Sequence, residues 1–226
     1  MLLNEEMWRM SGMVFKAHPW HGITLGEKSP NIINAYIELV PGDTIKYELD
    51  KHTGYLKIDR PQIYSNICPA LYGMIPQTYS GKRVAEYCNE KTGRTDIVGD
   101  SDPIDICVLT EKLIPHGDVL LKCRPIGGLR MLDGGEADDK IIAVMNDDPV
   151  YNERYDISVV PKSIINRLKH YFLTYKQSPD EKEQKCEITH IYGREEAYEV
   201  LKRSHEDYLE KFPDLDRMAK IVRGEL

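Results

Sequence analysis

Hydrophobic and polar residues alternate over short stretches of this chain, which predicts a protein built largely from β-strands. Residues 45–49 alternate strictly, with Lys46 and Glu48 at the polar positions, the period of a half-buried strand. Because successive side chains point to opposite sheet faces, Lys46 and Glu48 are expected on one face. Residues 51–54 are typical of a hairpin loop, and residues 55–59 of the returning strand.

Apolar runs separated by Pro- and Gly-containing turns predict further strands. After a strand-like stretch from Asn34 the candidates are Ile104–Leu109, Val119–Cys123, Ile126–Met131 and Lys140–Met145. Many short strands at this spacing suggest a barrel or a sandwich. Residues 76–99 are polar and too long for an ordinary connection, so we expect them to form some structure of their own.

Two helices are predicted to close the chain. Pro161 suits a first helical turn, and Ile164, Leu168 and Tyr175 recur at helical spacing after it; residues 195–212 repeat this pattern. We therefore expect one domain over residues 1–226, with a core at about 34–176. An N-terminal arm (1–33) and a C-terminal helical extension (177–226) flank that core.

Composition narrows the class of protein. The 226 residues are 41% hydrophobic and 30% charged, with a net charge of −7, values typical of a globular protein without a general nucleic-acid surface. No stretch approaches 18 consecutive apolar residues, and the first residues do not resemble a secretory signal. Five scattered cysteines without a CxxC pair favour reduced thiols. We expect a cytoplasmic protein that binds neither nucleic acid nor a membrane.

Asp100, Asp102 and Asp105 are the most informative residues for chemistry. Two like charges about 4 Å apart repel by roughly 4 kcal/mol at an effective dielectric near 20. A folded protein either leaves such a cluster in water or neutralises it with cations. Carboxylates are hard ligands that suit Mg²⁺ or Mn²⁺. From these three residues alone, a solvated acidic loop and a metal site are both open.

The surrounding motifs resemble those of soluble inorganic pyrophosphatases of family I. The run Asp100–Asp105 is similar to that family's Asp-x-Asp-Pro-x-Asp motif, and residues 133–140 to its Asp-x4-Asp-x-Lys spacing. The Lys-x-Glu strand at 46–48, Asp59-Arg60, Tyr72-Gly73 and Tyr175-Lys176 match in the family's order. Cys68 departs from the pattern, because many members have a tyrosine there.

The resemblance implies a set of metal ligands and a general base. Asp100, Asp105 and Asp138 would bind an activating Mg²⁺, for which Mn²⁺ or another divalent ion could substitute. Asp133, Asp138 and Glu48, with Glu38 as the weakest transfer, would hold further ions. Asp102 would lie at the metals and take the proton from the attacking water. Glu136 and Asp139 are interpreted as solvent-exposed carboxylates.

The resemblance also implies the groups that hold the substrate, pyrophosphate. The cations are Lys46, Arg60, Lys140 and Lys176, and the hydroxyl donors are Tyr72 and Tyr175. Arginine grips phosphate in a bidentate manner, while lysine acts as a point charge. Two structural alternatives stay open: Tyr175 falls in the apolar stripe of its helix, and Lys46 with Glu48 could form an ordinary exposed strand face.

The implied fold is α+β: a closed five-stranded OB-like β-barrel with helices packed outside. The implied assembly is a homo-oligomer, either a dimer or a hexamer. Two other functions compete with a pyrophosphatase. Another metal-dependent phosphoanhydride hydrolase would use the same carboxylates but would also need a pocket for a base. A non-enzymatic OB-like module would need aromatic platforms and a basic groove, which the acidic composition disfavours.

Overall fold

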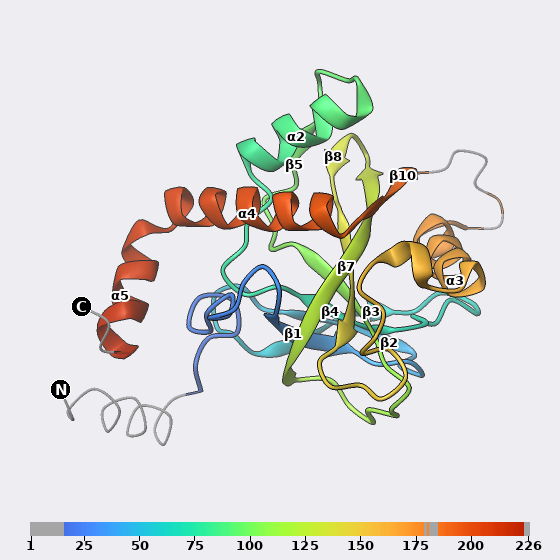
Figure 1. Cartoon of the computed structure of the whole chain (residues 1–226), viewed down its shortest axis with the longest axis horizontal. Coiled ribbons are helices and arrows are strands. Elements are labelled where there is room, and N and C mark those ends of the chain that lie inside the picture. Colours follow the sequence, from blue (N-terminus) through green and yellow to red (C-terminus); the bar gives the residue numbers. More distant parts are fainter. Residues whose placement is uncertain (1–15, 179, 181–184, 224–226) are drawn as a thin grey trace.

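Five strands form a closed ring in the computed structural model, which describes residues 16–178, 180 and 185–223. Each strand pairs with the next, and β7 returns to β1. The ring strands, in spatial order, are β1 (Ile33–Leu39), β4 (Leu71–Met74), β6 (Asp105–Leu109), β9 (Lys140–Met145) and β7 (Val119–Asp133). The predicted five-stranded barrel is therefore confirmed (Figure 1).

The barrel strands follow the predicted pattern closely, with one correction. The expected strands 119–123 and 126–131 form the single 15-residue strand β7. Its pairing register with β9 shifts between Pro125 and Gly127. A proline cannot donate a ladder hydrogen bond, and an extra residue in one strand forms a bulge. The break that suggested a turn is therefore an irregularity within one strand.

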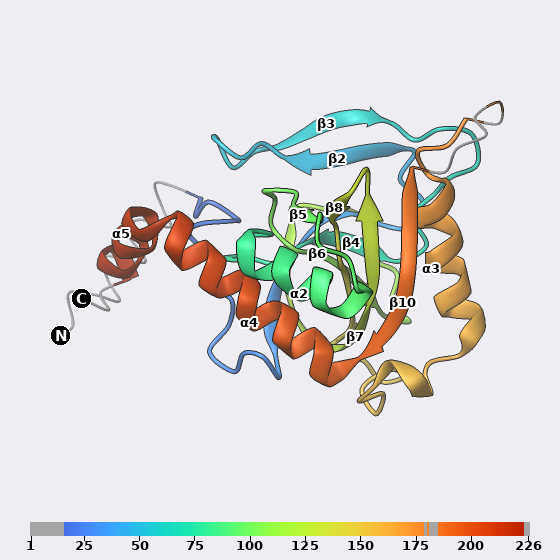
Figure 2. The same ribbon diagram turned by 90° about the horizontal axis from the view of Figure 1, so that it is seen from above.

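A two-stranded ribbon lies beside the barrel. It consists of β2 (Ile45–Leu49) and β3 (Leu56–Pro61), with Lys46 opposite Arg60. Figure 2 shows the ribbon running above the ring strands rather than within them. This arrangement lets residues 46–51 face the end of the barrel where β6 begins.

Helices pack outside the barrel on two sides. Helix α3 (Lys162–Thr174) lies on one side, and α2 (Lys82–Thr92) and α4 (Arg194–Lys211) lie together on the other (Figure 2). Helix α2 belongs to the segment 76–99, so the expectation that this segment has its own structure is confirmed. The same segment ends in the short strand β5 (Val98–Gly99), which pairs with β8 (Glu136–Ala137).

The C-terminal region is only partly helical, which corrects the predicted helical extension. Strand β10 (Cys186–Gly193) pairs antiparallel with β7. Within the described residues three α-helices follow the last ring strand in the chain: α3, α4 and α5 (Pro213–Arg223). The β-branched residues Ile188, Thr189 and Ile191 carry the strand signal that the helical reading overlooked.

Two hydrophobic clusters follow from the alternation of the ring strands. One contains Ile106, Ile141 and their counterparts from every ring strand, and it continues onto α2 and α4. The other contains the alternate residues, such as Cys107 and Ile142, and packs beneath α3. Residues 105 and 140 belong to the α3 side by the same alternation. A short 3₁₀-helix (Ile157–Val159) precedes α3.

Candidate active site

A cavity of about 270 Å³ opens where β6 and β9 begin, next to the β7–β8 hairpin and the β2–β3 ribbon. Eight carboxylates, four lysines and two tyrosines line it: Glu38, Glu48, Asp100, Asp102, Asp105, Asp133, Glu136, Asp138, Lys46, Lys51, Lys140, Lys176, Tyr72 and Tyr175. Residues scattered from 38 to 176 therefore meet in one place. Carboxylates outnumber ammonium groups two to one, which leaves the cavity acidic.

The Asp100–Asp105 run reaches the cavity through a tight turn before β6. Ser101 lies in the left-handed region with φ of 67°, and the Asp102 amide donates to Asp100 Oδ1 at 2.9 Å. Asp105 then begins β6, where it pairs in parallel register with Lys140 of β9. Two strand ends thus place a carboxylate beside a lysine.

A hairpin brings the second acidic motif to the same cavity. Gly134 and Gly135 adopt φ of 59° and 93°, a conformation that costs glycine little, and they connect β7 to β8. Asp133 pairs with Glu136 across this hairpin. Asp133 and Asp138 consequently line the cavity together with Asp100, as the family resemblance implies.

Lysines pair with most of these carboxylates. The Lys140 ammonium contacts both Asp105 and Asp138 and is almost completely buried. Lys176, which follows α3, contacts Asp133. Lys46 Nζ lies 3.0 Å from Glu48 Oε2, so the predicted shared face of these two residues is confirmed.

Negative charge remains poorly compensated in the buried part of the cavity. Burial and the neighbouring Asp138 raise the pKa of Asp100 to about 8. Burial raises the pKa of Glu38 to about 8, although the Leu49 amide donates to its carboxylate at 2.7 Å. Burial also raises the pKa of Asp138 to about 6, despite the opposing effect of Lys140. Added positive charge would stabilise all three carboxylates.

The donor set fits divalent metal ions in its chemistry. Carboxylate oxygens in excess of the available ammonium groups are the hard ligands that Mg²⁺ prefers. In the described part of the chain, no three His, Cys, Asp or Glu side chains are already arranged around one point as a metal site. The assignment of Asp100, Asp105, Asp133, Asp138, Glu48 and Glu38 as ligands therefore stays a prediction.

The two predicted tyrosines serve both the cavity and the core. Tyr72 donates to Asp105 at 2.6 Å, and Tyr175 is 7% exposed and lines the same cavity. Both rings lie near Phe172 of α3, with centroids 6.0 Å away. The structural reading of Tyr175 as a core residue is confirmed by its burial, while its hydroxyl role stays a prediction.

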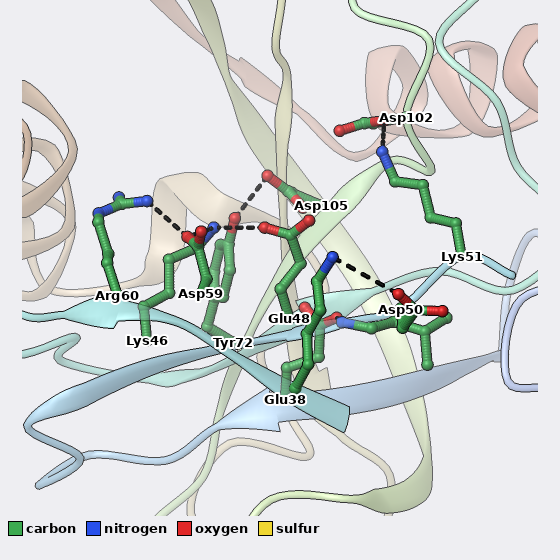
Figure 3. A network of polar contacts seen from close by, with 12 residues as sticks. Glu38, Lys46, Glu48, Asp50, Lys51, Asp59, Arg60, Tyr72, Asp102 and Asp105 are labelled. Atoms are coloured by element: carbon green, nitrogen blue, oxygen red, sulfur yellow. Dashed lines mark hydrogen bonds and ion pairs between the residues drawn. The ribbon is translucent and has the colours of Figure 1, made fainter. Parts of the chain in front are cut away.

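Arg60 lies beside the cavity rather than in its lining. Its Nη1 is 2.6 Å from Asp59, which also lies 3.0 Å from Lys46. Figure 3 shows Asp59 between the two cations on the β2–β3 ribbon. The guanidinium carbon lies 5.7 Å from the Tyr175 ring centre. Asp59 therefore holds Lys46 and Arg60 together at one rim of the site.

Two lining residues were not predicted from the sequence as site residues, and the exposure of one further carboxylate was predicted wrongly. Lys51 extends from the β2–β3 turn and contacts Asp102 (Figure 3); its position in a turn gives it no periodic signal. Glu136 is exposed, as expected, and it also lines the cavity; its even spacing from Asp138 and Lys140 is the signal that could have revealed this. The reading of Asp139 as solvent-exposed is wrong, because that residue is 1% exposed.

The fold and the cavity together indicate a class of protein: a barrel enzyme whose site is suited to divalent metal ions and a phosphate substrate. Carboxylates suited to metal ions and fixed cations suited to phosphate occupy one small cavity. Within the described residues no helix is long and apolar enough to cross a bilayer.

Comparisons with known proteins are specific about the family. The inorganic pyrophosphatase family model matches residues 35–209. An inorganic pyrophosphatase of Chlamydia caviae is 53% identical over 199 residues, covering 86% of this chain and 92% of that protein. Soluble inorganic pyrophosphatase 1 of Arabidopsis thaliana is 34% identical over 209 residues, covering 92% and 88%. The crystal structure of the inorganic pyrophosphatase from Thermus thermophilus superimposes with a TM-score of 0.70 at 28% identity, covering 84% and 98%. The chain belongs to the inorganic pyrophosphatase family.

Proposed function

We propose that this chain hydrolyses pyrophosphate to two orthophosphates with Mg²⁺ as cofactor. The observation that carries the proposal is the convergence of both acidic motifs and four lysines in one cavity. Membership of the inorganic pyrophosphatase family supports the same substrate. Pyrophosphate is a compact polyanion, so it needs cations on every side and little other recognition.

In this proposal the metal ligands divide into two groups. Asp100, Asp105 and Asp138 would hold the activating Mg²⁺. Asp133, Asp138 and Glu48, with Glu38 as the weakest candidate, would hold the ions that arrive with substrate. Bound Mg²⁺ lowers the pKa of water and shields phosphate oxygens from the nucleophile. Mn²⁺ is a suitable replacement because it prefers the same hard oxygen ligands.

The chain's own groups then position the substrate and move one proton. Lys46, Arg60, Lys140 and Lys176 bind phosphate oxygens, and Tyr72 and Tyr175 donate hydroxyl hydrogen bonds. Asp102 accepts a proton from the attacking water. The oxygen of that water bonds to phosphorus while the bridging P–O bond breaks and the second phosphate leaves. Groups fixed before the charge shifts onto the leaving phosphate stabilise the transition state most effectively.

Phosphate release separates this function from its two rivals. The purified chain with Mg²⁺ is expected to release phosphate from pyrophosphate at least 100-fold faster than from ATP, and EDTA should abolish the reaction. Comparable rates on both substrates would favour a general phosphoanhydride hydrolase. Absence of release from either, combined with oligonucleotide binding, would favour the non-enzymatic module.

The remaining expectations concern the setting of the enzyme. We infer that it acts as a homo-oligomer, a dimer or a hexamer, and that residues 1–226 form one domain. All five cysteines are unpaired and buried, a usage typical of reducing compartments such as the cytoplasm. Sedimentation of the purified chain would distinguish a dimer from a hexamer.

A further inference from the structure

A buried charged network lies on the face of the sheet opposite to Asp138 and Lys140. Arg130 of β7 and Asp139 have fully buried side chains, with Arg130 Nη1 2.8 Å from Asp139 Oδ2. The pairings of Leu132 with Ala137 and of Leu129 with Lys140 share one antiparallel register. Asp139 therefore stands directly opposite Arg130 across the two strands.

Because side chains alternate in direction along the chain, the Arg130–Asp139 pair lies on the face opposite to the cavity. Asp138 and Lys140 project to the cavity side, and Asp139 between them projects to the side covered by α2 and α4. The Asp138 amide donates to the Met131 carbonyl at 3.0 Å, although residues 138 and 139 lie between β8 and β9. The ion pair therefore lies at the gap between these two strands.

The C-terminal elements complete the network. Tyr192 of β10 donates to Asp139 Oδ2 at 3.1 Å, and Glu196 of α4 accepts from Arg130 at 2.7 Å. The position of the Tyr192 ring requires glycine at residue 128, because a Cβ there would lie 2.4 Å from the ring. The Arg130 guanidinium carbon also lies 4.9 Å from the Tyr192 ring centre.

Stability alone is a weak reason for such a pair. A buried ion pair loses the hydration of both charges, and apolar residues of similar volume often replace one without loss of stability. The ion pair and the bonds from Glu196 and Tyr192 hold the two side chains, while Arg130 Nε and Nη1 and Asp139 Oδ1 have no hydrogen-bond partner. In some proteins a buried charged network of this kind specifies one backbone arrangement. The network here links β7, β10 and α4, directly or through Arg130, to Asp139, which lies between the cavity residues Asp138 and Lys140.

We propose that Arg130 and Asp139, supported by Tyr192, are positioning residues that fix Asp138 and Lys140 in the geometry for Mg²⁺ and pyrophosphate. The pair acts through the backbone of residues 138–140 and touches neither ligand. The proposal rests on the proposed function for the identity of these ligands. It makes the site depend on β10 and α4, elements that contribute no residue to the cavity.

The test compares a network variant with a matched control elsewhere in the molecule. Asp139→Asn should weaken Mg²⁺ binding, measured by calorimetry without substrate, by at least 10-fold and should lower kcat by a similar factor. Asp207→Asn changes another buried, ion-paired carboxylate, which lies on α4 and faces α2. At a temperature where both variants are folded, the control should keep both quantities within twofold of the parent.

A milder variant covers the case in which Asp139→Asn does not fold. Tyr192→Phe removes one hydroxyl and should weaken Mg²⁺ binding about threefold. It should also accelerate amide hydrogen exchange in a peptide spanning 134–141, while a peptide from α3 stays unchanged. Unchanged exchange at 134–141 together with Mg²⁺ binding within 1.5-fold of the parent would overturn the proposal. Because exchange and metal binding are measured without substrate, a chain inactive on pyrophosphate would refute the proposed function and leave this test intact.

Discussion

At the scale of single residues, alternation along the chain places cavity-lining side chains on one face and buried structural side chains on the other. Asp138 and Lys140 line the cavity, while Asp139 between them enters a buried network. A similar division occurs on the β2–β3 ribbon, where Lys46 lines the cavity and Asp59 holds it in place from the partner strand. In both places a charged residue outside the cavity lining lies next to, or contacts, one that lines the cavity.

Asp102 offers the sharpest test at this scale. Asp102→Asn keeps the size of the side chain but removes a base that would accept the proton of the attacking water. General bases contribute about 100- to 10,000-fold to rate, so kcat should fall by at least 100-fold. Mg²⁺ binding measured by calorimetry should change by less than a factor of about five. A variant with near-parental kcat would exclude Asp102 as the base.

At the scale of elements, α2 depends on α4 for its N-terminal cap. Residue Gly81 before α2 supplies no side-chain cap. The Asp207 carboxylate of α4 instead accepts from the Arg83 amide at 2.9 Å and the Val84 amide at 3.1 Å. Anions at a helix N-terminus satisfy free amides and interact favourably with the helix dipole. A residue of one helix thus caps another helix whose capped amides lie 123 and 124 positions earlier in the chain.

Asp207→Ala should therefore destabilise the protein without changing the reaction. Loss of the carboxylate leaves buried amides without acceptors, which costs about 1–3 kcal/mol. Urea denaturation should show this loss in the free energy of unfolding. Because Asp207 does not line the cavity, kcat measured on the folded variant should stay within twofold. A large fall in kcat at equal foldedness would contradict this separation.

At the scale of the whole molecule, the described part of the N-terminal arm joins the ribbon to α4. Trp20 is 4% exposed and donates to the Thr78 carbonyl at 2.8 Å. His21 Nδ1 lies 3.0 Å from the Tyr208 hydroxyl of α4. His18 Nε2 lies 3.2 Å from the Lys51 carbonyl in the β2–β3 turn. The arm consequently contacts elements from both halves of the sequence.

This arrangement predicts a loss of stability in acid. Burial, reinforced by the nearby His18, lowers the pKa of His21 to about 4, against an ordinary value of 6.5. Between these values the unfolded state binds a proton that the folded state does not, so stability decreases as the pH falls from 6.5 towards 4. Between pH 7.5 and 5.0 the contribution is about 1 kcal/mol once partial exposure is allowed for.

Urea denaturation of the parent and of His21→Phe at both pH values measures this contribution. The variant should lose about 1 kcal/mol less than the parent on acidification, since other titrating groups are common to both proteins. Equal pH dependence of the two proteins would exclude His21 as a source of the acid sensitivity. The comparison uses a difference, so it is independent of any change in stability at pH 7.5.

The sequence by itself determined what depends on local pattern and on motif order. Period-two alternation located β2, apolar runs between Pro- and Gly-containing turns located β6 and β9, and helical spacing located α3 and α4. The ordered acidic motifs indicated the family and the residues that meet in the cavity. These predictions succeed because strand and helix periods, and the spacing of residues within a motif, depend on residues that are close together in the chain.

Tertiary structure decided what depends on pairing between distant segments. It joined two expected strands into β7, added β10 to the sheet, brought Lys51 onto Asp102 and buried Asp139 against Arg130. The strand pattern of β10 is local, but its pairing partner and the other contacts have no local signal, because burial and partner choice depend on distant segments rather than on neighbours in the chain. An aspartate in a polar run is therefore exposed or buried according to which distant residue stands opposite it.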